Sequence, residues 1–148
     1  MMNMDEIVII EDNPHDEMMI LDALSEKNIH NKIRVLHDGV ETLNYFFSPD
    51  GSLRKSDVDY PRFVLLDLKL PKVGGLEVLK RMKSDERARR IPIVIFTSSN
   101  EEKDRSECYL LGANSYIVKP LDADCFSHFV ADISSYWFMM NRTSYQDA

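Results

Sequence analysis

Several features that mark specialised protein classes are scarce in this sequence. Its two cysteines, Cys108 and Cys125, have no metal-ligand spacing, and we expect reduced, partly buried side chains in a cytoplasmic protein. No apolar run approaches the ~20 residues of a membrane span. The first ten residues, MMNMDEIVII, lack the basic start of a secretory signal. These absences argue against a membrane or secreted protein.

Basic residues are also in deficit, with 18 Lys and Arg against 25 Asp and Glu and a net charge of −7. A nucleic-acid binder usually carries a basic surface, so this balance argues against one. We expect the richest basic stretch to be a solvated face rather than a docking patch for an acidic partner. It comprises Lys80, Arg81, Lys83, Arg87, Arg89 and Arg90.

The 148 residues fit one domain, and we find no internal repeat. Apolar, β-branched runs predict strands buried on both faces, and amphipathic segments between them predict helices. Strands are expected at 7–10, 33–36, 63–66, 91–96 and 116–118. Helices are expected at about 14–27 and 39–47, from 76, at 100–111, and after Asp122. The longest loop is 48–61.

Particular residues support the predicted helix ends. Asn13 followed by Pro14 is a typical helix start, and Gly112 is a typical stop. We expect six apolar side chains of the last helix to face the core. They are Phe126, Phe129, Val130, Ile133, Trp137 and Met140.

Strands that alternate with helices predict an α/β fold, with a parallel sheet covered on both faces. For five strands the common doubly wound order is 2-1-3-4-5, the flavodoxin-like arrangement. The first and third strands are then neighbours at the topological switch point. Ligands bind there, at the carboxyl ends of the strands.

Polar residues stand where the predicted strands end. Glu11 and Asp12 follow the first strand, Asp67 the third, Thr97 the fourth and Lys119 the fifth. Two carboxylates ~4 Å apart repel by about 4 kcal/mol at an effective dielectric of 20, so the acids need a counter-charge. Lys119 supplies one, and a hard divalent cation such as Mg²⁺ would supply another.

A metal ion beside a carboxylate, a lysine and a hydroxyl is equipment for phosphoryl transfer. The chain has neither a Walker nor a protein-kinase glycine loop, so it does not look like an ATP user. Asp67 is best placed to act as the nucleophile and form an aspartyl phosphate. Glu11 and Asp12 would hold the metal, and Lys119 and Thr97 would bind the phosphoryl oxygens.

These residues resemble the receiver domain of two-component response regulators. The resemblance runs from about 6 to 137 and rests on four segments, IVIIEDNP, FVLLDLKLPKVGG, IPIVIFTSS and GANSYIVKP. The EDNP motif, the long loop before the third strand and the SYWF end are similar to single-domain regulators paired with bacterial phytochrome-type histidine kinases. The resemblance implies one receiver domain over 1–148, with a core of 6–137 and a tail of 138–148.

The resemblance also implies roles for individual residues. Asp67 would be the phospho-acceptor, with Glu11, Asp12, Asp67 and the backbone carbonyl of Lys69 as ligands of Mg²⁺ or Mn²⁺. Thr97 and Lys119 would assist the chemistry, and Thr97 and Tyr116 would be the switch pair. Members of the family have a cis peptide bond at the position before Pro120.

The implied function is signalling, with the protein assisting its own phosphorylation and dephosphorylation rather than acting as a conventional enzyme. The phosphoryl donor would be the phosphohistidine of a histidine kinase or of a histidine phosphotransfer protein. The output surface would be formed by helix 100–111, strand 116–118 and the last helix. A partner or a second copy would bind this surface, or a homodimer would form through the aromatic C-terminal end.

Two alternatives compete with this interpretation. A receiver-like docking module would keep the fold without phosphorylation. A flavin-binding flavodoxin-like protein would share the architecture, but it would need a Ser/Thr/Gly-rich loop after the first strand. The sequence there is EDNPHDE, whose acids suit a metal rather than a flavin phosphate.

Overall fold

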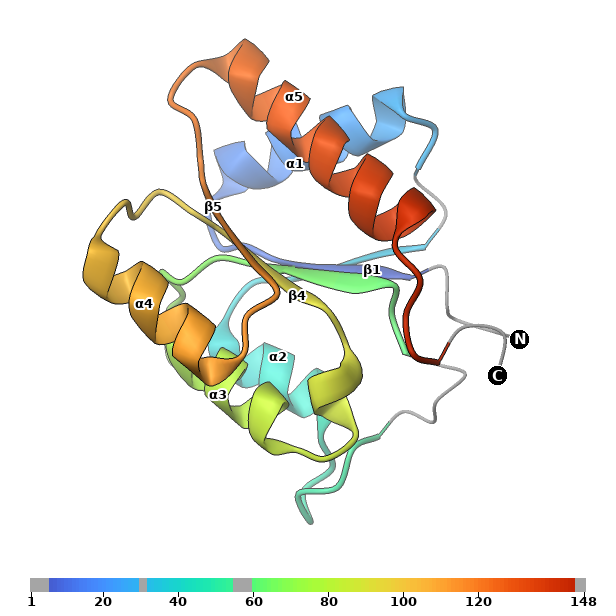
Figure 1. The fold of residues 1–148 in the computed structure, drawn as a ribbon, viewed down its shortest axis with the longest axis vertical. Helices are drawn as coiled ribbons and strands as arrows, with labels where there is room; N and C mark the ends of the chain where they lie inside the picture. Colours follow the sequence, from blue (N-terminus) through green and yellow to red (C-terminus); the bar gives the residue numbers. More distant parts are fainter. Residues whose placement is uncertain (1–5, 30–31, 55–59, 146–148) are drawn as a thin grey trace.

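The computed structural model describes residues 6–29, 32–54 and 60–145, in which strands and helices alternate (Figure 1). The strands are β1 (Ile7–Ile10), β2 (Ile33–Leu36), β3 (Phe63–Leu66), β4 (Ile93–Thr97) and β5 (Ser115–Val118). The α-helices are α1 (Pro14–Glu26), α2 (Gly39–Phe46), α3 (Gly75–Ser84), α4 (Glu102–Leu111) and α5 (Ala123–Ser134). A 3₁₀ turn (Ala88–Arg90) precedes β4, and a π-helical segment (Ser135–Met140) extends α5.

The strands form one parallel sheet in the order β2-β1-β3-β4-β5. In the central pairing, Ile7 of β1 lies opposite Phe63 of β3. This confirms the predicted doubly wound α/β fold. It also places the ends of β1 and β3 side by side, as the switch-point argument requires.

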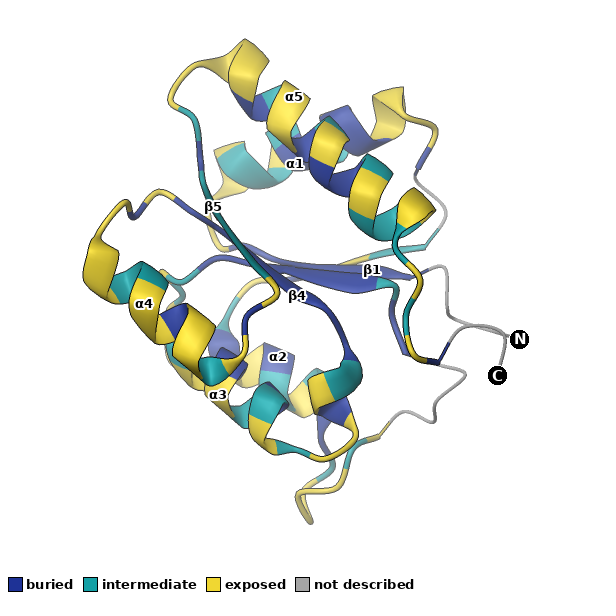
Figure 2. Ribbon diagram, in the orientation of Figure 1, coloured by how far each residue is buried: buried dark blue, intermediate teal, exposed yellow. Residues whose placement is uncertain are grey.

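Helices cover both faces of the sheet, with α1 and α5 on one side and α2, α3 and α4 on the other (Figure 1). Side chains of β1 alternate between the two layers. Val8 and Ile10 pack into the cluster under α2 and α3, whereas Ile7 and Ile9 pack into the cluster under α1 and α5. The three central strands, β1, β3 and β4, are accordingly buried along their whole length, whereas the edge strands β2 and β5 are only partly buried (Figure 2).

The predicted helix ends are present. The Asn13 side chain caps α1, accepting bonds from the backbone N–H groups of His15 and Asp16 at 2.9 and 3.0 Å. Gly112 ends α4 with a φ of 106°, a conformation that glycine adopts without strain. The strand predicted at 91–96 begins later, at Ile93, and Pro92 lies just before it, since proline has no N–H to give the ladder.

The predicted core face of the last helix is only partly correct. Phe126, Val130 and Ile133 are buried, but Phe129 and Met140 are 41% and 62% exposed. Phe129 lines an open pocket with Ile117 of the edge strand β5, so part of its ring meets solvent. Met140 falls out of phase because the helix changes to π geometry at Ser135, and that geometry has more residues per turn than an α-helix.

The basic stretch is not simply a solvated face. The Lys83 ammonium donates to the carbonyl oxygens of Arg89 and Ile91 and to Oδ1 of Asn114, at 2.9–3.0 Å. Burial lowers the pKa of Lys83 to about 8. The Arg81 guanidinium stacks 3.7 Å from the ring centroid of Phe47. These contacts tie α3 to its neighbours.

The segment after the π-helix returns to the core. Tyr145 is 1% exposed, and its ring packs edge-on against Tyr60 with centroids 5.0 Å apart. Its hydroxyl donates to the carbonyl oxygen of Pro61 at 2.6 Å.

Residues 55–59 of the long predicted loop lie outside the described ranges. Within the described ranges, the helices lack the length and apolar character needed to cross a bilayer.

Candidate phosphorylation and metal site

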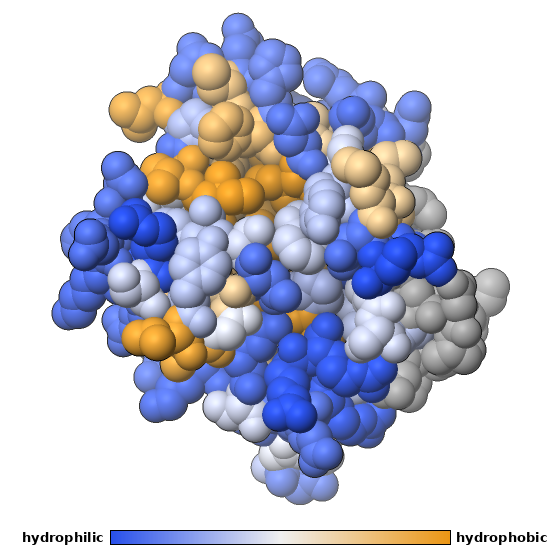
Figure 3. Space-filling model, viewed as in Figure 1, coloured by the Kyte–Doolittle hydropathy of each residue, from blue (hydrophilic) through white to orange (hydrophobic). Residues whose placement is uncertain are grey.

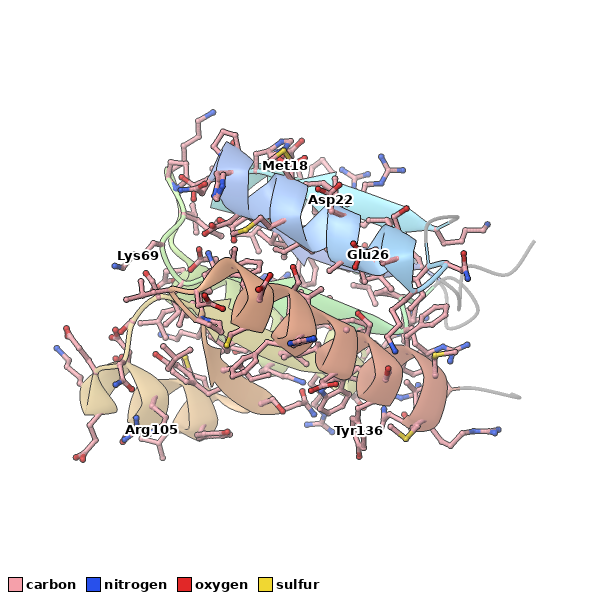
Figure 4. All side chains as sticks on the ribbon, turned by 90° about the horizontal axis from the view of Figure 1, so that it is seen from above. Met18, Asp22, Glu26, Lys69, Arg105 and Tyr136 are labelled. Carbon is pink, nitrogen blue, oxygen red and sulfur yellow. The ribbon has the colours of Figure 1, made fainter. Side chains whose placement is uncertain are left out.

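The polar residues predicted at the strand ends meet at one edge of the sheet. Glu11 and Asp12 follow β1, Asp67 follows β3, and Lys119 follows β5. Figure 4 shows Lys69, two residues beyond Asp67, among the loops that gather at this edge. The chain brings together residues from three separate loops because parallel strands all end on the same side.

The three acids form a compact group. One carboxylate oxygen from each of Glu11, Asp12 and Asp67 lies within 4.8 Å of the others. Glu11 and Asp67 are 2% and 6% exposed, whereas Asp12 is open to solvent. Three hard oxygen donors with one open side are a suitable set for Mg²⁺, which keeps several waters and uses few protein carboxylates.

Lys119 is the buried counter-charge of this group. Its side chain is 7% exposed, and Nζ donates to Oε1 of Glu11 at 2.7 Å and to Oδ2 of Asp67 at 2.8 Å. A third bond, also 2.8 Å, runs to Oδ2 of Asp16 in the first turn of α1. The prediction of Lys119 as the counter-charge is confirmed, but Asp16 was missed.

The pKa shifts reflect this crowding. Burial raises the pKa of Glu11 to about 7, although its bond from Lys119 acts in the opposite direction. Burial by itself would lower the pKa of Lys119, but the hydrogen bonds to Asp16, Asp67 and Glu11 outweigh it and raise that pKa above its ordinary value. Lys119 is therefore held as an ammonium. This one positive charge does not balance the several carboxylates around it, so the group can accept a further cation.

Thr97 and Tyr116 are linked through a residue that the sequence did not single out. The Thr97 hydroxyl is fully buried and accepts a long bond, 3.4 Å, from the backbone N–H of Ser99. The Tyr116 hydroxyl donates to the backbone carbonyl of the same Ser99 at 2.9 Å. The Ser99 hydroxyl in turn donates to Asp104 of α4. Ser99 therefore contacts Thr97, Tyr116 and Asp104 of α4 at the same time.

Backbone contacts shape the loop after β3. The N–H of Lys69 donates to Oδ1 of Asp67 at 3.2 Å, and the Lys69 side chain is exposed at the mouth of the site. A Cβ on Gly75 would lie 2.4 Å from the carbonyl oxygen of Asp67, so only glycine fits there. The peptide bond before Pro120 is trans, whereas the family resemblance leads to the expectation of a cis bond.

Comparison with known proteins places the chain in a family. Residues 7–131 match the model of the response regulator receiver domain. That match covers most of the chain, and the sheet order and the acidic edge agree with it. This protein therefore belongs to the response regulator receiver family, whose members are phosphorylated signalling proteins rather than conventional enzymes.

Individual relatives fall in the same group. The probable methanogenesis regulatory protein FilR2 of Methanothrix harundinacea is 39% identical over 137 residues, 93% of this chain and 86% of that protein. The response regulator Rcp1 of Synechocystis is 32% identical over 131 residues, 88% of this chain and 87% of that protein. The phosphorylated cyanobacterial phytochrome response regulator RcpA superimposes with a TM-score of 0.83 at 31% identity, over 94% of this chain and 97% of that one.

The Mn²⁺-bound form of Rcp1 superimposes with a TM-score of 0.81 at 27% identity, over 93% of this chain and 98% of that one. The similarity to phytochrome-associated regulators agrees with the finer resemblance drawn from the sequence.

Proposed function

We propose that this receiver acts in the cytoplasm and accepts a phosphoryl group on Asp67 from the phosphohistidine of a sensor histidine kinase or histidine phosphotransfer protein, in a Mg²⁺- or Mn²⁺-dependent reaction. The observation that carries the proposal is the Lys119 ammonium, 2.8 Å from Oδ2 of Asp67 and 2.7 Å from Glu11. Lys119 offsets part of the charge of the acids, and a divalent cation bound by them would offset the rest, so that Asp67 could receive an anionic phosphoryl group. We propose Glu11, Asp12, Asp67 and the carbonyl of Lys69 as the metal ligands.

In the proposed reaction, an Asp67 oxygen attacks phosphorus while the N–P bond of the phosphohistidine breaks. The imidazole keeps the electron pair of the broken bond, and Asp67 becomes an acyl phosphate. The metal ion, when bound, supplies positive charge to the transferring oxygens. Lys119 binds one phosphoryl oxygen by charge. Water later hydrolyses the acyl phosphate and regenerates the carboxylate.

The Thr97 hydroxyl is proposed to turn from Ser99 toward the phosphoryl group. Because Ser99 also holds the Tyr116 hydroxyl, that motion would release Tyr116 and shift α4. We propose that a partner protein or a second copy reads the result on the α4–β5–α5 face. Apolar surface is visible where α5 lies over β5 (Figure 3), with Ile117, Phe129 and Ile133 lining a shallow pocket there.

The C-terminal aromatic end offers a second site for a homodimer. Tyr136, Met139 and Met140 are 48%, 64% and 62% exposed. Light scattering during gel filtration, with and without phosphorylation, tests both dimer contacts. A protein that stays monomeric in both states would leave signalling to a different partner.

The central test is incubation with acetyl phosphate and Mg²⁺ followed by intact-mass measurement. We expect the mass of one added phosphoryl group in the natural protein and none in Asp67→Asn. Asp50→Asn, at an exposed loop carboxylate, serves as the matched control and should be phosphorylated normally. Absence of the added mass in the natural protein, together with failure to bind Mg²⁺, would favour the docking module instead.

A further inference from the structure

The Lys119 ammonium has three N–H groups, and each one points to a different carboxylate. The acceptors are Glu11, Asp67 and Asp16, at 2.7, 2.8 and 2.8 Å. Only the first two belong to the acidic group proposed to hold the metal ion and receive the phosphoryl group. Asp16 is therefore the single partner of Lys119 that stands outside that group.

Each carboxylate oxygen of the other two partners already accepts one hydrogen bond. Oε1 of Glu11 accepts from Lys119, and Oε2 accepts from the backbone N–H of Asn13 at 3.1 Å. In Asp67, Oδ2 accepts from Lys119 and Oδ1 from the backbone N–H of Lys69 at 3.2 Å. A metal ion bound here would therefore share the Glu11 and Asp67 carboxylates with Lys119 and compete with it for their negative charge.

Asp16 is well placed to remain bonded to Lys119 when Glu11 and Asp67 bind a metal ion or a phosphoryl group. It is the third residue of α1, where the exposed N–H groups of the helix start favour a negative charge. The Asn13 side chain fixes this first turn by accepting the N–H of Asp16. The Asp16 side chain is 21% exposed, against 2% for Glu11, so it stands nearer the mouth of the site.

We infer that Asp16 is a positioning residue that holds the Lys119 ammonium while Glu11 and Asp67 serve the metal ion and the phosphoryl group. The inference rests on the function proposed above. Without the Asp16 carboxylate, Lys119 would direct its N–H groups only to Glu11 and Asp67. It would then compete more strongly with a divalent cation for their oxygens, and Mg²⁺ would bind more weakly.

The test is calorimetric titration with Mg²⁺ alone, repeated for three variants. Asp16→Asn keeps the size of the side chain but removes its charge, and we expect about tenfold weaker binding, the low end of what loss of a supporting partner costs a metal site. Asp16→Glu keeps the charge and should recover much of the affinity. Asp22→Asn removes the same charge from the outer face of α1, beside Met18 and Glu26 (Figure 4), and should leave the affinity unchanged.

A double-mutant cycle separates an effect through Lys119 from a direct effect on the ion. In a Lys119→Met background, Asp16→Asn should weaken Mg²⁺ binding no further. Equal weakening with and without Lys119 would overturn the inference. Circular dichroism checks that Lys119→Met folds. If that variant does not fold, the contrast between Asp16→Asn and Asp16→Glu decides.

Two further outcomes keep this inference apart from the proposed function. If the natural protein takes up a phosphoryl group and Asp16→Asn binds Mg²⁺ as tightly as the natural protein does, the inference alone fails. If the natural protein binds Mg²⁺ but is never phosphorylated, the proposed function fails. A merely structural role in α1 would lower the melting temperature of Asp16→Asn without Mg²⁺ yet leave its Mg²⁺ affinity intact, and that result also overturns the inference.

Discussion

Replacing Lys119 with methionine would remove the charge on which the acidic group depends, while keeping a side chain of similar length. The Lys119 side chain is 7% exposed, and its ammonium makes three contacts of 2.7–2.8 Å with carboxylates. Each attraction amounts to about 6 kcal/mol at an effective dielectric of 20, but burying the ammonium offsets much of the total. Removal of one partner from a buried ion pair costs about 3–5 kcal/mol, and we expect that loss in the free energy of unfolding.

The same substitution should make the protein depend on divalent cations. Without Lys119, the oxygens of Glu11 and Asp67 are open to Mg²⁺, which would supply the missing charge. Binding to the folded state adds about 2.7 kcal/mol of stability at a concentration one hundred times the Kd. The deficit of Lys119→Met relative to the natural protein should therefore shrink when Mg²⁺ is added.

Urea unfolding, followed by circular dichroism in EDTA and in excess MgCl₂, measures both effects. Lys80→Met, at an exposed lysine of α3, removes the same charge away from the site and should change stability by less than about 1 kcal/mol. The reasoning fails if Lys119→Met loses no more than this control in EDTA. It also fails if the deficit is as large with Mg²⁺ as without it.

Two other perturbations test local features of the structure. Gly75→Ala should lower stability by about 1–3 kcal/mol and slow phosphorylation by acetyl phosphate, because the added Cβ would lie 2.4 Å from the Asp67 carbonyl oxygen and displace the acceptor loop. Among the thiols, Cys125 is exposed and should react with iodoacetamide in the folded protein. Cys108 is buried, and burial raises its pKa to about 11, so it should stay unmodified at pH 8 until the protein unfolds.

Each of these has its own control. Gly74→Ala places its Cβ no closer than 3.9 Å to a neighbour and should be well tolerated, so equal damage at both glycines would contradict the steric argument. For Cys108, the raised pKa predicts that the folded protein loses stability at high pH. The folded state keeps the Cys108 proton above the ordinary thiol pKa of 9.0, so the stability that this residue contributes falls as pH rises beyond 9.0. Rapid labelling of Cys108 in the folded protein would refute its burial.

The sheet and most of the site were predictable because they rest on local patterns and one topological rule. Apolar runs define β1, β3 and β4, and parallel strands must all end at one edge. Glu11, Asp67 and Lys119 were therefore expected to meet although they are far apart in the sequence. The strand order and the parallel direction of the strands are enough to predict that these residues lie at one edge of the sheet.

What was missed depends on contacts that no local pattern announces. Asp16 looks like an ordinary acid in the first turn of a helix, and its bond to Lys119 spans 103 residues. Its position three residues after the Asn13 cap was the only available signal. Ser99 acts mainly through its backbone, which the sequence does not identify. Met140 was misplaced because a change to π-helical geometry alters the phase of a helix without a clear mark in its residues.

The burial of Tyr145 bears on where this chain can be shortened. The family resemblance suggests a boundary near residue 137, yet the Tyr145 ring fills space beside Tyr60, and its hydroxyl bonds to Pro61 just before β3. Loss of a buried aromatic ring costs about 3–5 kcal/mol. A chain ending at Trp137 would therefore be missing an interior side chain, and a shortened receiver intended for transplantation into another protein should retain residues up to Tyr145.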